Sequence, residues 1–199
     1  MLDDNFEKAV CGMLHYYGLI PLAEILNISV RKGFCSHVDY KNCMGKIGNL
    51  VSGKKAYFYK YNLCSKLLVN AGIIDDMQKN SHMAEYKIFD KKDYVVSGSK
   101  YLNKTTEMLN LEKYFLKVSS KSEFYVENEV ARIWVELNNM CDLFTLTRES
   151  IFNLGLNYSK KDIEFFNIFM AINSMANKMP RWFCKGYSYS EASMCYTGA

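Results

Sequence analysis

Cationic and aromatic side chains are concentrated in one stretch of this sequence, residues 31–66. Eight lysines and arginines stand there against a single acid, Asp39, and this excess exceeds the whole chain's net charge of +4. Cations interleaved with flat rings suit a phosphate backbone and, where the rings are exposed, unstacked bases. The candidate contacts are five cations that would hold phosphates and two tyrosines that would pack or stack beside them: Arg31, Lys32, Lys54, Lys55, Lys60, Tyr57 and Tyr59.

Two other interpretations of residues 31–66 stay open. The lysines could keep a glycine-rich loop soluble while the aromatic side chains alternate into the core, or the basic surface could meet an acidic protein. The chain has only four arginines among its 25 cationic residues. Because paired contacts to guanine favour the arginine fork, contact with phosphates is favoured over recognition of a base sequence.

A near match to a phosphate-binding loop lies within the same stretch, at residues 48–55. The sequence GNLVSGKK has the glycines and the lysine, but Lys55 stands where a magnesium-binding Ser or Thr is needed. The preceding residues, YKNCMGKIGN, are too polar and too rich in glycine for the buried strand that such a loop follows. Nucleotide hydrolysis is therefore not expected here.

Potential metal ligands occur at Cys35, His37 and Cys43, with Cys11 and His15 four residues apart on an earlier helix. Structural zinc sites use paired C-x2-4-C or H-x3-5-H spacings, which this segment lacks. We expect Cys11 to be a core residue and His15 a helix residue with its hydrogen bonds satisfied. No cofactor is expected, although whether Cys35, His37 and Cys43 bind metal stays open.

No motif for nucleophilic or metal-assisted catalysis is present. The sequence contains neither G-x-S-x-G nor H-E-x-x-H, and no cysteine or histidine has a recognisable catalytic flank. Glu127, Glu129 and Glu136 are typical of the solvated face of a helix that is apolar on its other side. We therefore expect a protein that is not an enzyme.

The first half of the chain predicts helices, a tight turn and a short strand. An apolar stripe covers residues 2–17 and stops at Gly18, and Pro21 opens a second short helix. Aromatic content predicts a strand at 56–61, a helix is expected at 62–72, and a hairpin is expected around the polar segment within 73–90. This arrangement predicts a winged-helix-like unit.

The second half has helical periodicity throughout. We expect a mainly α protein in which the winged-helix-like unit, residues 1–99, packs on a helical bundle, residues 100–199, unless the chain is one continuous domain. The longest apolar run is too short to span a bilayer. The helices are expected near residues 90–97, 103–117, 121–139, 143–154 and 160–177.

The segment after the last long helix, KMPRWFCKGYSYSE, combines rare residues at 178–191. Pro180 is expected to end the helix, and Ser188 with Glu191 has the spacing of a capping box for a final short helix. Trp182 and Phe183 are interpreted as an anchor that holds this turn onto the helical body. The segment therefore predicts a structural cap, in preference to a binding patch.

The motifs YYGLIPLAEILNI and N-x-M-P-R-W-x-x-x-G-Y-S-x-x-E resemble those of uncharacterised bacterial proteins that carry a SEC-C metal-binding tail. That tail is absent here, since only Cys184 and Cys195 lie near the end, so its zinc function is not carried over. The resemblance implies a mostly helical cytosolic protein of low-GC Gram-positive bacteria or their mobile elements, and no transferable activity. The matching residues are Tyr17, Gly18, Asn177, Arg181, Trp182, Gly186, Tyr187, Ser188 and Glu191.

Two functions follow as hypotheses. The first is a non-catalytic, nucleic-acid-associated or regulatory protein that contacts a DNA or RNA backbone through residues 31–66. The alternative is a protein-interaction module, such as a phage- or mobile-element-encoded inhibitor of a host protein. The acidic start lacks the pattern of a signal peptide, and seven scattered cysteines suit a reducing compartment, so a cytoplasmic location without membrane contact is expected. The sequence does not indicate an oligomeric state.

Overall fold

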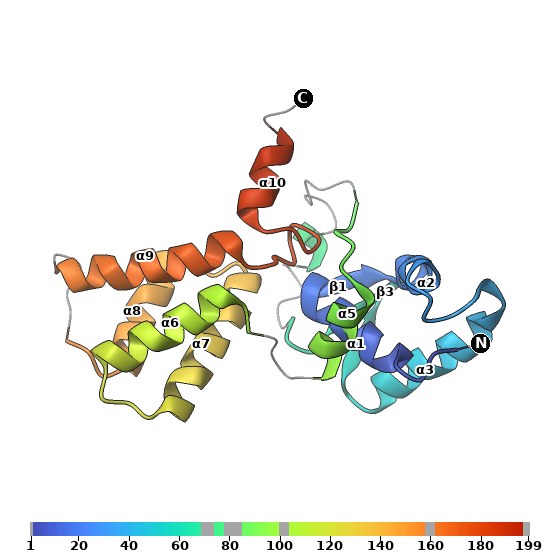
Figure 1. Ribbon diagram of the computed structural model, residues 1–199, viewed down its shortest axis with the longest axis horizontal. Helices are drawn as coiled ribbons and strands as arrows, with labels where there is room; N and C mark the ends of the chain where they lie inside the picture. Colours follow the sequence, from blue (N-terminus) through green and yellow to red (C-terminus); the bar gives the residue numbers. More distant parts are fainter. Residues whose placement is uncertain (1, 69–73, 78–84, 100–103, 158–161, 197–199) are drawn as a thin grey trace. The chain divides into compact units, whose positions relative to one another are not determined.

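The computed structural model describes residues 2–68, 74–77, 85–99, 104–157 and 162–196 (Figure 1). The chain forms two compact units. Unit 1 comprises Met1–Asn103 together with Arg181–Gly186, and unit 2 comprises Lys104–Pro180 together with Tyr187–Ala199. A division by chain order alone, at residues 99 and 100, leaves 181–186 in the second half, whereas the structure assigns this short segment to unit 1.

Unit 1 begins with alternating helices and strands that form a three-stranded antiparallel sheet in the order β1-β3-β2. Leu19 of β1 pairs with Cys64 of β3, and Tyr59 of β2 pairs with Asn62 of β3. Helix, strand, helix, helix and a two-stranded hairpin are the connectivity of a winged helix, so the expected helical fold with a short hairpin is confirmed. In chain order the elements are α1 (Phe6–Tyr17), β1 (Leu19–Pro21), α2 (Leu22–Arg31), η1 (His37–Asp39), α3 (Tyr40–Ser52), β2 (Ala56–Tyr59), β3 (Asn62–Ser65) and α5 (Lys91–Ser99).

The hairpin lies earlier in the chain than expected. Residues 62–65, expected to begin a helix, form β3, and residues 69–72 of that prediction lie outside the described residues. β3 is the central strand and all four of its residues are buried, so it lacks the alternation by which a half-exposed strand is recognised. The hairpin expected within 73–90 is wrong where the structure describes that segment, because residues 74–77 are helical and 86–90 have no assigned secondary structure.

The closest helix pair in unit 1 is α1 with α5. A Cβ on Gly12 would lie 2.0 Å from the carbonyl oxygen of Tyr94, and one on Gly98 would lie 1.7 Å from that of Lys8. These two glycines let the two backbones touch. Tyr94 is fully buried beside them, and its hydroxyl shares a 2.5 Å hydrogen bond with Tyr17.

Unit 2 is built from helices, as expected from its periodicity. Side chains of Thr105, Ser122 and Asp142 accept hydrogen bonds from backbone N–H groups at the starts of three of them. Ser188 and Glu191 bond reciprocally, which confirms the predicted capping box (Ser188 N to Glu191 Oε2, 2.8 Å; Glu191 N to Ser188 Oγ, 3.2 Å). The helices are α6 (Thr106–Val118), α7 (Glu123–Asn138), α8 (Leu143–Asn153), α9 (Ile163–Lys178) and α10 (Tyr189–Tyr196).

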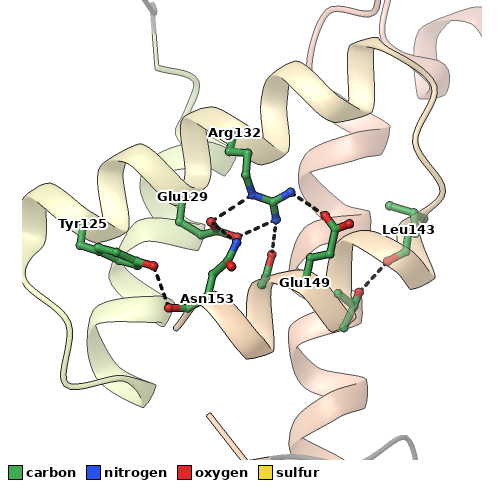
Figure 2. Close-up of polar contacts among 8 residues, drawn as sticks. Tyr125, Glu129, Arg132, Leu143, Glu149 and Asn153 are labelled. Carbon is green, nitrogen blue, oxygen red and sulfur yellow. Dashed lines mark hydrogen bonds and ion pairs between the residues drawn. The ribbon is translucent and has the colours of Figure 1, made fainter. Parts of the chain in front are cut away.

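A polar network joins α7 to α8 (Figure 2). Arg132 donates to both carboxylate oxygens of Glu129, at 3.1 and 2.8 Å, and to Glu149 at 2.7 Å. Asn153 donates to Glu129 at 3.0 Å. Glu129 is buried, so its interpretation as part of a solvated face is wrong: its charge is compensated by the arginine fork. Among the described helices, none has the length and apolar character needed to cross a membrane.

Candidate nucleic-acid interface

Helices α2 and α3 form a helix-turn-helix pair in unit 1, and α3 is its second helix. The sequence patterns did not predict α3. Cys43, Ile47 and Leu50 form its buried face, at helical spacing. Glycines at 45 and 48 gave the segment the composition of a loop, although this apolar spacing could have revealed the helix. Ser36 and Asp39 form a capping box at the preceding turn, with Ser36 Oγ donating to Asp39 Oδ2 at 2.6 Å. These bonds hold the pKa of Asp39 at about 2.

The outward face of α3 carries Lys41, Gly45, Gly48 and Ser52, all exposed. A Cβ on either glycine would meet nothing within 4 Å. A glycine inside a helix costs about 1 kcal/mol relative to alanine, and no close approach within the described structure requires one here. The face is therefore smooth and leaves the helix backbone accessible to an approaching partner. Lys41 was not among the residues selected from the sequence, because the helix that positions it was not expected.

The predicted cations divide into paired and unpaired ones. Lys32 lies 3.7 Å from Asp90, and Lys60 lies 3.0 Å from Asp75. The hydrogen bond from Lys60 to Asp75 raises the pKa of Lys60. These two ammonium groups are already partly neutralised by carboxylates of unit 1.

In the basic segment, four exposed cations form no ion pair with the described residues: Arg31, Lys41, Lys54 and Lys55. Arg31 is the last residue of α2, and Lys41 is in the first turn of α3. Lys54 and Lys55 occupy the turn from α3 into β2. Helix α3 therefore has an unpaired lysine in its first turn and two more in the turn that follows its C-cap residue, Gly53.

The predicted tyrosines are anchored to the scaffold. Tyr57 donates to the carbonyl oxygen of Leu68 at 2.6 Å, and Tyr59 donates to Asp75 at 3.0 Å. Burial raises the pKa of Tyr57 to about 12. The more exposed rings are their neighbours, Phe58 at 45 % and Tyr61 at 87 %. Strand alternation could have separated Phe58 from Tyr57 and Tyr59, whereas Tyr61 lies in the turn between β2 and β3.

The structure brings two of the three candidate metal ligands together. The thiol of Cys35, in the segment before α3, contacts the thiol of Cys43 on the buried face of α3, whereas His37 is exposed. Burial raises the pKa of Cys43 to about 12, which makes this thiol a poor metal ligand or nucleophile at neutral pH. Across the described residues, no group of three His, Cys, Asp or Glu side chains is placed to hold a metal ion.

The residues that carry the resemblance to SEC-C-containing proteins are divided between the two units. Those in unit 1 are Tyr17, Gly18, Arg181, Trp182 and Gly186, and those in unit 2 are Asn177, Tyr187, Ser188 and Glu191. Trp182 packs on Gly18, and Gly186 packs on the ring of Tyr17. Trp182 Nε1 also donates to the carbonyl oxygen of His15 at 2.9 Å. These residues form a structural contact, as expected for a cap. Comparisons with known proteins give no significant match to a family model, a curated protein or a solved structure.

Proposed function

We propose that unit 1 is a non-catalytic module that binds the phosphate backbone of nucleic acid through α3 and the turn that follows it. One observation carries the proposal. Between Tyr40 and Tyr61 the chain has five lysines and no acidic residue, and this segment forms the second helix of a winged helix, α3, and the first strand of its hairpin, β2. Second helices of helix-turn-helix units enter the major groove in many DNA-binding proteins.

The chemistry of this surface favours phosphates over bases. Lys41, Lys54 and Lys55 are exposed and unpaired among the described residues, and an ammonium group binds phosphate as a point charge. The segment has no arginine. Gly45 and Gly48 would let a phosphate backbone come close to the helix. Phe58 and Tyr61 offer rings to unstacked bases, so a single strand is a second possible ligand of the same surface.

The experiment is a binding titration with labelled duplex and single strand of random sequence, at about 50 mM salt. Replacing Lys41, Lys54 and Lys55 by alanine is expected to weaken binding at least tenfold. The matched control replaces three exposed cations of unit 2, Lys113, Lys117 and Arg148, which removes the same charge. Absence of binding by the wild type, or equal weakening by the control variant, overturns the proposal.

The second candidate is a module that binds an acidic protein surface. Lys32, Lys46 and Lys60 already contact carboxylates of unit 1, so this basic surface accepts carboxylates as ligands. The two candidates differ in one observable. A protein ligand captured through Lys41, Lys54 and Lys55 remains bound after nuclease treatment, whereas capture through nucleic acid is lost.

A further inference from the structure

Unit 1 contains a cavity of about 370 Å³ beside its sheet. This volume is near the lower end of the range for small-molecule sites, roughly 300–1,000 Å³. The residues that line the cavity come from β1, from β3 and from later parts of unit 1: Leu19, Pro21, Asn62, Met77, Tyr86, Trp182 and Lys185. None of them is assigned above to phosphate contact, so a ligand in this cavity is independent of the proposed function.

The walls of the cavity are mostly apolar. Leu19, Met77 and Trp182 are core residues, and Pro21 lies beside them at the end of β1. The hydroxyl of Tyr86 donates to the carbonyl oxygen of Leu19 at 3.4 Å, which holds the tyrosine against β1. Such walls favour a ligand with an apolar or aromatic body, because burial of apolar surface drives its binding.

Among the residues that line the cavity, Lys185 carries the charge. Its Nζ atom lies 5.2 Å from the ring centroid of Tyr86, and the residue is half-buried. Burial lowers the pKa of Lys185, and the negative charge of Glu24 opposes this shift. An ammonium group that has lost part of its hydration interacts more strongly with an anionic ligand than a fully exposed one does.

The backbone around Lys185 is fixed by contacts within unit 1. Lys185 N donates to the carbonyl oxygen of Trp182 at 3.1 Å, and the carbonyl oxygen of Lys185 accepts from Lys87 N at 3.1 Å. The indole of Trp182 donates to the carbonyl oxygen of His15 at 2.9 Å. The lysine therefore extends from a pre-organised turn, which reduces the entropy that is lost when a ligand binds.

Asn62 adds a buried polar group to the cavity. It is 8 % exposed, and its side-chain amide donates to the carbonyl oxygen of Tyr59 at 3.3 Å. Within the described parts of the chain, this amide makes no other hydrogen bond. Its second N–H and its carbonyl oxygen are therefore available to a ligand, and a buried amide gains from such a partner.

We propose that this cavity binds a small monocarboxylate with an apolar or aromatic body. The carboxylate pairs with the ammonium group of Lys185, and the amide of Asn62 provides a hydrogen bond to the same ligand. The body of the ligand lies against Leu19, Met77 and Trp182. One ammonium group matches a single negative charge, whereas a phosphate monoester carries close to two charges at neutral pH and would be only partly compensated.

Isothermal titration calorimetry of the full chain with phenylbutyrate tests the proposal, and the uncharged phenylbutyramide is the comparison ligand. The wild type is expected to bind the carboxylate with a Kd of about 1 mM or below, and about fivefold more tightly than the amide. Lys185→Met keeps the length of the side chain and removes its charge, so this variant should bind both compounds equally weakly. Lys87→Met is the matched control, since Lys87 is also half-buried and its Nζ atom lies 5.2 Å from the ring centroid of Phe89.

Circular dichroism and urea unfolding establish that both variants are folded. A wild type that does not bind phenylbutyrate at about 10 mM, or a Lys185→Met variant that still prefers the carboxylate, overturns the proposal. Equal loss of the preference in Lys87→Met also overturns it, because the preference would then follow net charge. These outcomes do not depend on nucleic-acid binding, which is assigned to other residues.

The two tryptophans locate the bound ligand. Trp134 belongs to unit 2, whereas Trp182 lines the cavity, and Trp134→Phe assigns their indole N–H signals in a proton–nitrogen correlation spectrum. Phenylbutyrate is expected to shift the signal of Trp182 and to leave that of Trp134 in place. An unshifted Trp182 signal at saturation, or equal shifts of both signals, contradicts binding in this cavity.

Discussion

The indole ring of Trp182 lies directly over the backbone of Gly18, which ends α1. Gly18 has a φ of +64°, and a Cβ there would lie 2.4 Å from Trp182 Cδ2. Two residues that are 164 positions apart in sequence therefore fix each other: the glycine provides the space that the ring occupies. Together they attach residues 181–186 to the first helix of unit 1.

Replacing Gly18 by alanine is expected to destabilise unit 1 by about 3 kcal/mol, because steric overlap adds to the cost of the left-handed backbone. Urea unfolding measures the change. Gly33→Ala is a matched control, since Gly33 has a φ of +68° and open space around it, and should cost only about 1–2 kcal/mol. Equal losses in the two variants would show that the Trp182 contact contributes nothing.

Acid is expected to destabilise the fold through His15. Burial lowers the pKa of His15 to about 4, from an ordinary value of 6.5. Well above pH 6.5 the His15 imidazole is neutral in both the folded and the unfolded chain. Below pH 6.5 it takes up a proton in the unfolded chain, whereas in the folded chain it stays neutral down to about pH 4. The free energy of unfolding should therefore fall by about 2 kcal/mol between pH 7 and pH 5, and level off below pH 4.

Replacing His15 by phenylalanine should flatten the pH dependence of stability over this window. Urea unfolding at pH 5, 6 and 7 makes the comparison. An unaltered pH slope in the His15 variant contradicts the assignment.

The Arg132 network is expected to behave as a unit. Replacing Arg132 by methionine leaves the buried Glu129 carboxylate without its main partner and should cost about 3 kcal/mol. Replacing Glu129 by leucine in the same variant removes the buried charge and should recover part of that loss. A double-mutant cycle from urea unfolding gives the coupling energy. Strictly additive effects would show that the two side chains act independently.

Substitutions at Gly45 and Gly48 are expected to have opposite effects on the stability of unit 1 and on its affinity for nucleic acid. Replacing both by alanine is expected to raise the free energy of unfolding by about 1–2 kcal/mol, because the helix interior favours alanine and nothing opposes the new Cβ atoms. The same variant should bind nucleic acid more weakly, since its α3 no longer admits the closest approach. A stabilised variant with undiminished affinity would show that α3 does not contact the ligand.

The periodicity of apolar residues predicted the helices that bury one face and expose the other. Helices α6 to α9 were expected within a few residues of their ends, because each buries one face and exposes the other. β3 was not recognised, since a central strand buried on both faces has no alternation. Helix α3 was missed because Gly45 and Gly48 lower helix propensity, and tertiary packing of Ile47 and Leu50 overrides that preference.

The candidate site was only partly visible in the sequence. The charge count located the basic stretch, but pairing depends on residues distant in the chain: Asp90 binds Lys32, and Asp75 binds Lys60. Likewise, Tyr57 and Tyr59 have rings of the kind that stacks on bases, but their hydroxyls are hydrogen-bonded to Leu68 and Asp75. Such partners follow from the tertiary fold, which local patterns do not specify.

The salt dependence of duplex binding tests the central claim most directly. Each phosphate contact contributes about 0.9 to the slope of log affinity against log salt concentration for duplex DNA. If Lys41, Lys54 and Lys55 hold phosphates, replacing all three by alanine should reduce that slope by about 2.7, whereas the control variant of unit 2 keeps the wild-type slope. A wild type without duplex affinity at low salt, or a triple variant with an unchanged slope, would contradict the proposed phosphate-binding surface on unit 1.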